Sequence, residues 1–301
     1  ASDVYKRQLI MCGMAAGFSA LFGTPAAAAV FAIEVTVVGI AHYSAIVPCL
    51  LSSLTAAMVA DWFHVKPTSF LVRYIPEFHA DSYFMLARTI IMGIAGAIVS
   101  IVFCKIMSKT AELYKKYIKN PYLRILAGGA IVAAISMLIY ALTGSFDYNG
   151  AGTDIIKKAF IGQSRPEAFI LKMLLTALTL GCGFKGGEIV PSLYIGATFG
   201  CFFGGLLGLS HSFGAAVGLA AVFCGVTNCP FATLLLTIEL FGADGLPYYA
   251  LVIGISYMLS GYTGLYSAQK FYDNKFIHRR FRHLKTYKEI KTDSAANNGK
   301  D

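Results

Sequence analysis

The chain has 301 residues, of which 56% are hydrophobic and 14% are charged, with a net charge of +9. A soluble domain is usually about 45–50% apolar and about 25% charged, so this composition excludes an ordinary soluble globular protein. Apolar stretches at or near the roughly 20 residues that cross a bilayer as a helix follow one another along the chain. In order they are Leu9–Ile40, Ser44–Phe63, Met85–Met107, Ile125–Leu142, Phe169–Phe184, Ile189–Leu209, Phe213–Phe241 and Pro247–Leu265. The sequence therefore predicts a multi-pass protein of the cell membrane.

Prolines interrupt several of these stretches. Pro25, Pro191 and Pro230 lie inside apolar sequence, where a proline ends or begins a helix rather than continuing one. We expect an all-α membrane protein whose helices differ in length and tilt, several of them broken. Residues 9–290 are predicted to form this transmembrane domain.

The two ends differ from the apolar body. Residues 1–8 are polar and join abruptly to apolar sequence, so we expect a non-native leader there. Residues 291–301 are predicted to be a disordered cytoplasmic tail. Of the 25 Lys and Arg residues, six lie in Lys105–Arg124 and nine in Lys270–Lys300. Basic segments beside apolar spans fit the positive-inside rule better than nucleic-acid binding, so both are expected in the cytoplasm, against the lipid bilayer.

A faint internal repeat relates the two ends of the apolar region. The segment Gly13–Glu34 matches Gly218–Glu239 at eight of 22 positions, always 205 residues apart, and the matches include the proline and the final glutamate. Paired, proline-interrupted segments in two halves of a chain indicate the binding site of a transporter. We expect the two segments to be alike in shape and opposite in orientation across the membrane.

The run from Gly183 to Gly200 is the most distinctive part of the sequence. Gly186 and Gly187 break a helix, and Pro191 suits the first turn of a new helix near Val190. The N–H groups just before that helix lack intrahelical partners and lie at the positive end of its dipole. Such a terminus attracts an anion, although a kinked and closely packed helix explains the glycines equally well.

This run, Gly-Phe-Lys-Gly-Gly-Glu-Ile-Val-Pro from Gly183, is similar to the Gly-x-Phe-x-Pro loop of the CLC family of chloride channels and halide/proton antiporters. The repeated segments and the sequence Gly-Leu-Tyr-Ser-Ala from Gly264 resemble further parts of that family. The resemblance covers residues 9 to about 285. It implies an inverted-repeat bundle of tilted and broken helices with an incomplete first repeat, and a homodimer with one ion pathway in each subunit.

By position, the resemblance assigns an anion site to four residues. A central halide site would lie at the break at Gly187. It would be lined by the backbone N–H groups of Glu188 and Ile189 and by the hydroxyl of Tyr266. A tyrosine hydroxyl in an apolar span needs a hydrogen-bond partner, and a neutral donor suits an anion that must also leave. Without the resemblance, anchoring at the membrane interface would be the simpler interpretation of Tyr266.

Three acidic residues lie inside or directly beside these apolar stretches, where charged side chains are costly and usually functional. Glu34 and Glu239 are equivalent in the repeat, and capping or pairing is the preferred interpretation for both. Glu188 lies within the anion loop, where proton handling and an ion pair with Lys185 are the two alternatives.

Two elements of the family, its serine loop and its loop with the gating glutamate, are not found and would belong upstream of residue 9. The chain is therefore interpreted as N-terminally truncated and unable by itself to form a complete ion pathway. Two residues resemble the fluoride-exporting branch of the family. One is Glu188, and the other is Val35, which stands at the position of a second, proton-relaying acid. The Ser260–Tyr262 approach to Tyr266 resembles that branch too, whereas Val190 does not.

These features predict transmembrane halide transport, coupled to protons as antiport, with fluoride somewhat favoured over chloride. A chloride channel, a chloride/proton antiporter and a non-functional fragment are alternatives. An intramembrane hydrolase is disfavoured because the sequence has no HExxH, no Gly-x-Ser-x-Gly and no serine–histidine pair within its spans. The seven cysteines have no CxxC spacing and are interpreted as packing residues. We expect no enzyme activity, no metal and no cofactor.

Overall fold

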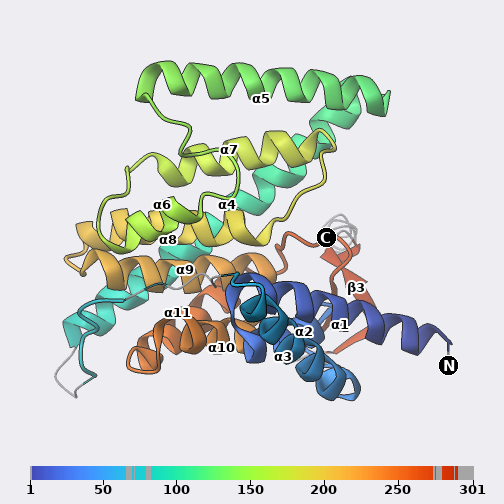
Figure 1. Cartoon of the computed structure of the whole chain (residues 1–301), viewed down its shortest axis with the longest axis vertical. Coiled ribbons are helices and arrows are strands. Elements are labelled where there is room, and N and C mark those ends of the chain that lie inside the picture. The colour runs from blue at the N-terminus through green and yellow to red at the C-terminus, as the bar shows by residue number, and fades with distance from the viewer. Residues whose placement is uncertain are drawn as a thin grey trace, which may run out of the picture.

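The computed structural model describes residues 2–65, 70, 72–78, 83–273, 275, 280–287 and 289–290. The predicted tail, residues 291–301, lies outside the described residues. The described chain is mostly helical, and Figure 1 shows how its helices are arranged. The helices are α1 (Ser2–Phe22), α2 (Pro25–Glu34), α3 (Ile46–Trp62), α4 (Tyr83–Tyr117), α5 (Pro121–Thr143), α6 (Thr153–Phe160), α7 (Ala168–Gly181), α8 (Ile189–Leu206), α9 (His211–Thr227), α10 (Pro230–Phe241) and α11 (Leu246–Leu259). A short 3-10 helix, Tyr43–Ala45, leads into α3.

Both repeat segments form a helix, a tight break and a second helix that opens on proline. The break after α1 centres on Thr24, with φ −123° and ψ 74°. The break after α9 centres on Cys229, with φ −118° and ψ 77°. The two breaks therefore have the same backbone shape, as the repeat predicts. Residues 2–8, which we set apart as a leader, continue α1 as helix.

The second helices of the two repeat units, α2 and α10, lie against one another and are linked by their glutamates. The Glu34 carboxylate accepts hydrogen bonds from the backbone N–H groups of Phe231 and Ala232, at 3.2 and 2.8 Å. The Glu239 carboxylate accepts from the equivalent pair on α2, 205 residues earlier, at 3.0 and 2.8 Å. Each helix thus ends against the start of the other. The two helices are antiparallel, as an inverted repeat requires, and the capping interpretation of both acids is confirmed.

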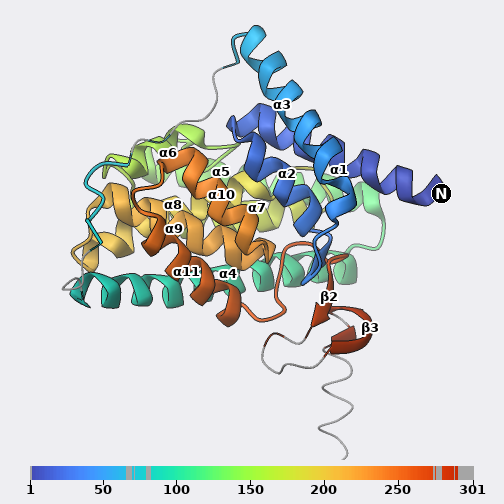
Figure 2. The ribbon, with the colours of Figure 1, turned by 90° about the horizontal axis from the view of Figure 1, so that it is seen from below.

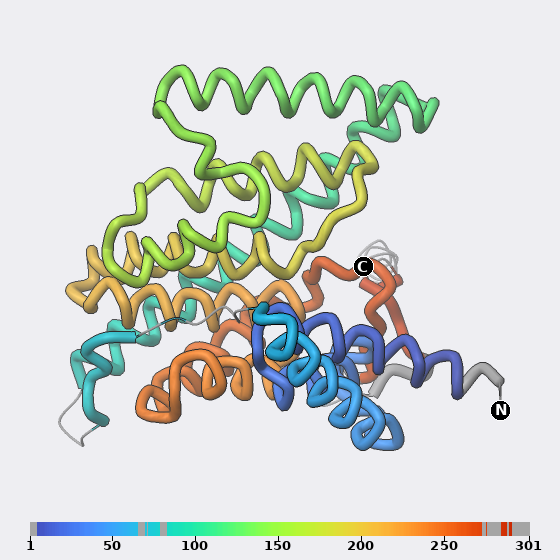
Figure 3. Tube along the Cα trace, in the orientation of Figure 1, coloured from blue at the N-terminus to red at the C-terminus, as the bar shows by residue number. Residues whose placement is uncertain are grey.

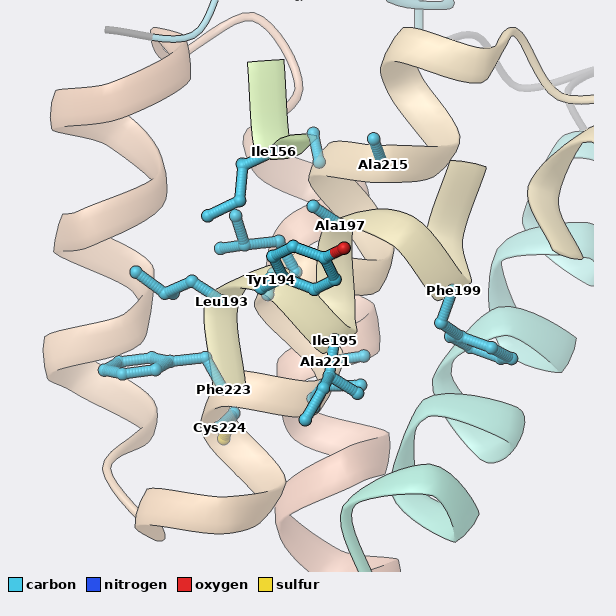
Figure 4. Packing of buried hydrophobic residues seen from close by; sticks show 14 of the residues in the cluster. Ile156, Leu193, Tyr194, Ile195, Ala197, Phe199, Ala215, Ala221, Phe223 and Cys224 are labelled. Carbon is cyan, nitrogen blue, oxygen red and sulfur yellow. The ribbon is translucent and has the colours of Figure 1, made fainter. Parts of the chain in front are cut away.

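The packing core lies between α8 and α9, which are antiparallel neighbours joined by a short turn (Figure 3). Glycines line the contact on both helices, and a methyl group on Gly196 or Gly200 would clash with the backbone of α9. Small residues let membrane helices approach closely and gain van der Waals contact. Around this contact the side chains interdigitate, with Tyr194 of α8 fully buried beside Ile156 of α6 and residues of α9 (Figure 4).

Several helices are suited to face lipid. Four helical segments, Tyr43–Trp62, α4, α5 and α8, are long and apolar enough to cross a membrane. The apolar windows of α3 and α5 are only 17% and 11% buried, respectively. In Figure 1, α5 lies at the edge of the molecule, and in Figure 2 α3 projects from the side opposite the strands. Exposed apolar helices of this length need a bilayer around them.

A small sheet is a part of the architecture that the sequence did not predict. Strands β1 (Val37–Val38), β2 (Lys270–Asp273) and β3 (Arg280–Thr286) lie in the order β1-β2-β3, with β1 parallel to β2 and β2 antiparallel to β3. Strands of two to seven residues carry too little periodicity to stand out beside apolar helices. The sheet ties the chain after α11 to the end of α2.

Candidate anion site

The loop between α7 and α8 breaks the helix where the sequence predicts. α7 ends at Gly181 and α8 begins at Ile189, one residue before the predicted start at Val190. Gly183 has φ +118°, which glycine adopts readily and other residues do not, so the chain leaves α7 in a sharp turn. Glu188 is the N-cap of α8, and its side chain makes no capping hydrogen bond.

The start of α8 presents unsatisfied backbone donors. The first hydrogen bond of its opening turn runs from the N–H of Ser192 to the carbonyl of Glu188, at 3.2 Å. Among the described residues, the N–H groups of Glu188 and Ile189 have no acceptor. Pro191 lies in the first turn and has no N–H to satisfy. Two free donors therefore point out of the positive end of the helix.

Glu188 is half-buried, and its carboxylate does not form the ion pair with Lys185 that the sequence suggested as one alternative. Lys185 is exposed, and the ion pairs between described residues do not include one between Lys185 and Glu188. The carboxylate lies within electrostatic range of Cys104 on α4 and of Tyr266. Among the described residues no hydrogen bond or ion pair holds this acid, so it can change its protonation without breaking one.

Tyr266 follows α11 in a turn that folds back onto the end of α9. The N–H of Leu265 donates to the carbonyl of Val226 at 3.0 Å and fixes that turn. Tyr266 is half-buried and packs against the main hydrophobic cluster, as Ile189 and Val190 do. Among the described residues its hydroxyl has no hydrogen-bond partner in the structure.

A cavity of about 540 Å³ lies beside the loop, lined by Gly186, Gly187, Val190 and Pro191. A methyl group on Gly187 would meet nothing within 4 Å, so the loop backbone is accessible there. Lys172 of α7 lies at the same cavity with only 2% of its surface exposed. Its amine donates to the carbonyl groups of Tyr148, at 3.3 Å, and Gly150, at 2.5 Å.

Sequence reasoning missed Lys172 and a second polar cluster. Lys172 had a signal, since it is a lone cation within the apolar stretch Phe169–Phe184. The second cluster joins Asn228, at the end of α9, to Gln269 and Lys275. Asn228 has φ 58°, a conformation that asparagine tolerates better than most residues. Lys275 had no such signal, because it is one of nine basic residues near the C-terminus.

The chain is similar to known proteins over most of its length. The family model described as "Voltage gated chloride channel" matches residues 1–261. The chain is 34% identical over 271 residues to a "Chloride/fluoride channel protein" of Pseudomonas syringae pv. tomato, which covers 88% of this chain and 58% of that protein. It is 24% identical over 253 residues to an "H(+)/Cl(-) exchange transporter ClcA" of Vibrio cholerae, covering 78% of this chain and 52% of the relative.

Solved structures give the same result for the fold. The crystal structure of a CLC-type fluoride/proton antiporter aligns with a TM-score of 0.81 and 32% identity, over 88% of this chain and 65% of that one. A slow cyanobacterial Cl⁻/H⁺ antiporter aligns with a TM-score of 0.68 and 20% identity, over 84% of this chain and 61% of that one. The chain thus spans somewhat less than two thirds of the relatives it matches.

Proposed function

Because the chain belongs to the voltage-gated chloride channel family and is a multi-pass membrane protein, we propose that the complete protein transports halide ions. The observation that carries the proposal is the start of α8. Its two backbone donors lack acceptors among the described residues, and its N-cap lies in electrostatic range of Tyr266. A helix N-terminus in an apolar surrounding binds an anion, and neutral donors hold it weakly enough to let it leave.

We propose that Gly187, Glu188, Ile189 and Tyr266 form the central anion site. Three features support this assignment: the accessible backbone at Gly187, the free N–H groups of Glu188 and Ile189, and a tyrosine hydroxyl without a partner among the described residues. The site needs no cofactor, because an anion is held there by backbone and hydroxyl donors alone.

Proton coupling with a preference for fluoride is the second part of the proposal. Glu188 is an acid with no ion pair to Lys185, next to the donors that would hold the anion. A carboxylate there repels a halide, whereas a carboxylic acid does not, so protonation and anion binding favour one another. The relative named as a chloride/fluoride channel and the solved fluoride/proton antiporter support the same substrates.

We further propose that the protein works as a homodimer in the lipid bilayer, with residues 9–290 as its membrane domain. The exposed apolar surface of α3 and α5 supports the bilayer as surroundings. The homodimer rests on family membership.

Anion efflux from proteoliposomes made with the complete reading frame tests the function. We expect fluoride and chloride efflux, fluoride somewhat faster, with protons moving in the opposite direction. Tyr266→Ala should reduce efflux about tenfold or more, since it removes one of about three donors to the ion. Tyr122→Ala is the matched control, because Tyr122 is 82% exposed at the start of α5.

The outcomes separate the parts of the proposal. Unchanged efflux in Tyr266→Ala would remove this site, and absence of efflux in the wild type would remove the function. Efflux without proton movement would favour a channel over an antiporter. Chloride efflux with no fluoride preference would remove only the substrate assignment.

A further inference from the structure

Lys275 is held in a polar pocket at the far end of α9. Its amine donates to the side-chain oxygen of Asn228 at 2.6 Å and to the carbonyl of Tyr257 at 2.9 Å. It also lies 3.9 Å from the centre of the Tyr257 ring, a cation–π distance. The backbone N–H of Lys275 donates to the hydroxyl of Tyr262 at 3.2 Å. Both ends of the residue are thus fixed to the α11 region.

The pocket lies at the ends of helices, and the side-chain amides of Asn228 and Gln269 have hydrogen-bond partners for both of their N–H groups. The side-chain nitrogen of Asn228 donates to the carbonyl of Thr263 at 2.9 Å and to the side-chain oxygen of Gln269 at 3.2 Å. The nitrogen of Gln269 donates to the carbonyls of Val35 and Thr227, at 2.9 and 2.8 Å. Asn228 and Gln269 are 1% and 3% exposed, respectively. Buried polar networks of this kind are costly unless complete, so they hold their members in defined positions.

Lys275 lies close to the turn that carries Tyr266 and close to a second cavity. Asn228, which accepts a hydrogen bond from the amine, donates to the carbonyl of Thr263, three residues before Tyr266. Asn228 and Tyr257, which hold the amine, line a half-open cavity of about 700 Å³ together with Glu34. The amine is therefore in contact with two residues that line this cavity.

Within the part of the chain that the structure describes, no acidic side chain neutralises the charge on this amine. Among the described residues no carboxylate lies within ion-pair distance of it. The titratable groups that face it are Cys224 of α9, Cys229 before α10, and the tyrosines 257 and 262. Thiols and phenols are uncharged near neutral pH. Glu34 lies near the same cysteines, but its two oxygens are occupied by the start of α10.

We propose that Lys275 is a charge-bearing residue beside the anion pathway, and that its protonation controls how readily an anion reaches Tyr266. The inference rests on the proposed halide transport. When the amine takes up a proton, no other bond breaks and the resulting ammonium attracts the anion. When the proton leaves, the attraction is lost while the neutral amine keeps its hydrogen bonds. Burial lowers the pKa of Lys275 to about 7, so both forms are populated near neutral pH.

The test compares Lys275→Met and Lys275→Arg with the wild type in proteoliposomes of the complete protein. Fluoride efflux is measured with the same pH on both sides, from pH 6 to pH 8.5. Methionine keeps an apolar chain without charge, and arginine stays charged throughout this range. A unit charge about 10 Å from the ion changes its occupancy about tenfold at an effective dielectric constant of about 20. Lys119→Met is the control, since Lys119 is an exposed lysine in the other basic segment.

We expect the wild-type rate to exceed that of Lys275→Met about tenfold at pH 6 and to approach it at pH 8.5. Lys275→Arg should keep the fast rate at pH 8.5. A constant ratio of wild type to Lys275→Met across the range overturns the inference but leaves the proposed transport intact. If Lys275→Met does not fold, equal rates of Lys275→Arg and wild type at pH 8.5 overturn it instead. If the wild type shows no efflux, both proposals fall.

Discussion

At the scale of single residues, the carboxylates of Glu34 and Glu239 cap the N-termini of two helices, as a bound anion would. Each carboxylate accepts two backbone N–H groups that have no partner within their own helix. The proline-led starts of α2 and α10 are therefore occupied by the protein's own anions. The start of α8 has no such carboxylate, because Glu188 makes no capping hydrogen bond. This difference supports the proposed anion site at the start of α8.

The reciprocal caps predict a graded loss of stability. Glu34→Gln leaves one acceptor oxygen and turns an NH₂ group toward a backbone donor, so we expect a loss of about 2–3 kcal/mol. Glu239→Gln should cost only about 1 kcal/mol, because Glu239 is exposed and screened whereas Glu34 is buried. Glu112→Gln, an exposed change on α4, is the control. Thermal unfolding in mild detergent measures all three, and a larger loss for Glu239→Gln than for Glu34→Gln would contradict the argument.

The register of these acids was predictable, but their partners were not. The repeat placed Glu34 and Glu239 at equivalent positions, and their location near helix ends indicated capping. That each caps the helix of the other unit depends on the antiparallel packing of α2 and α10, which no local pattern encodes. Lys275 was unpredictable for a related reason. Its partners, Asn228 and Tyr257, are 47 and 18 residues away in sequence.

At the scale of elements, the contact between α8 and α9 decides how the anion loop is held. A methyl group on Gly200 would clash with the backbone of Gly214 and Gly218, and one on Gly218 would clash with Gly196 and Gly200. The axes can be this close only because both helices lack side chains at the contact. Since α8 begins at Ile189, its position against α9 also sets where the free N–H groups point.

Gly200→Ala therefore should destabilise the protein, although alanine favours a helix over glycine. We expect a loss of about 1–3 kcal/mol from overpacking, and reduced anion efflux because the start of α8 shifts. Gly254→Ala on α11 is the matched control, since a methyl group there meets nothing within 4 Å. Helix propensity predicts a gain of about 0.5–1 kcal/mol for it. Equal unfolding temperatures of the two variants would show that close contact between α8 and α9 does not require glycine at position 200.

The predicted helix boundaries agree with the structure where a helix coincides with an apolar stretch. They differ where the helix continues into polar sequence. The break before α8 and the breaks inside Leu9–Ile40 and Phe213–Phe241 follow from prolines and glycines in apolar sequence. α4, in contrast, runs to Tyr117, well beyond the predicted Met107. Its last turns contain lysines, which continue a helix as well as apolar residues do while their charges reach water. Hydropathy finds the part of a helix that lies in lipid, and not where its hydrogen bonding stops.

At the scale of the whole molecule, the groups assigned to the anion site all come from one chain. Ile189 and Tyr266 pack against the same hydrophobic cluster, and the turn before Tyr266 is fixed to the end of α9. Glu188 and Tyr266 are in electrostatic range within that chain. Since all of these residues belong to one chain, a dimer of this chain would contain two copies of the proposed site.

Independent sites predict additive transport in a mixed dimer. Wild-type and Tyr266→Ala subunits with different affinity tags are expressed together, and dimers carrying both tags are purified and reconstituted. Because the residues proposed for each site come from one chain, we expect about half the efflux rate of the wild-type dimer when both subunits are the complete protein, with the halide preference unchanged. A rate near that of the doubly substituted dimer would mean that the two subunits share one pathway. Failure to recover any particle with both tags, checked by cross-linking and light scattering, would count against the dimer itself.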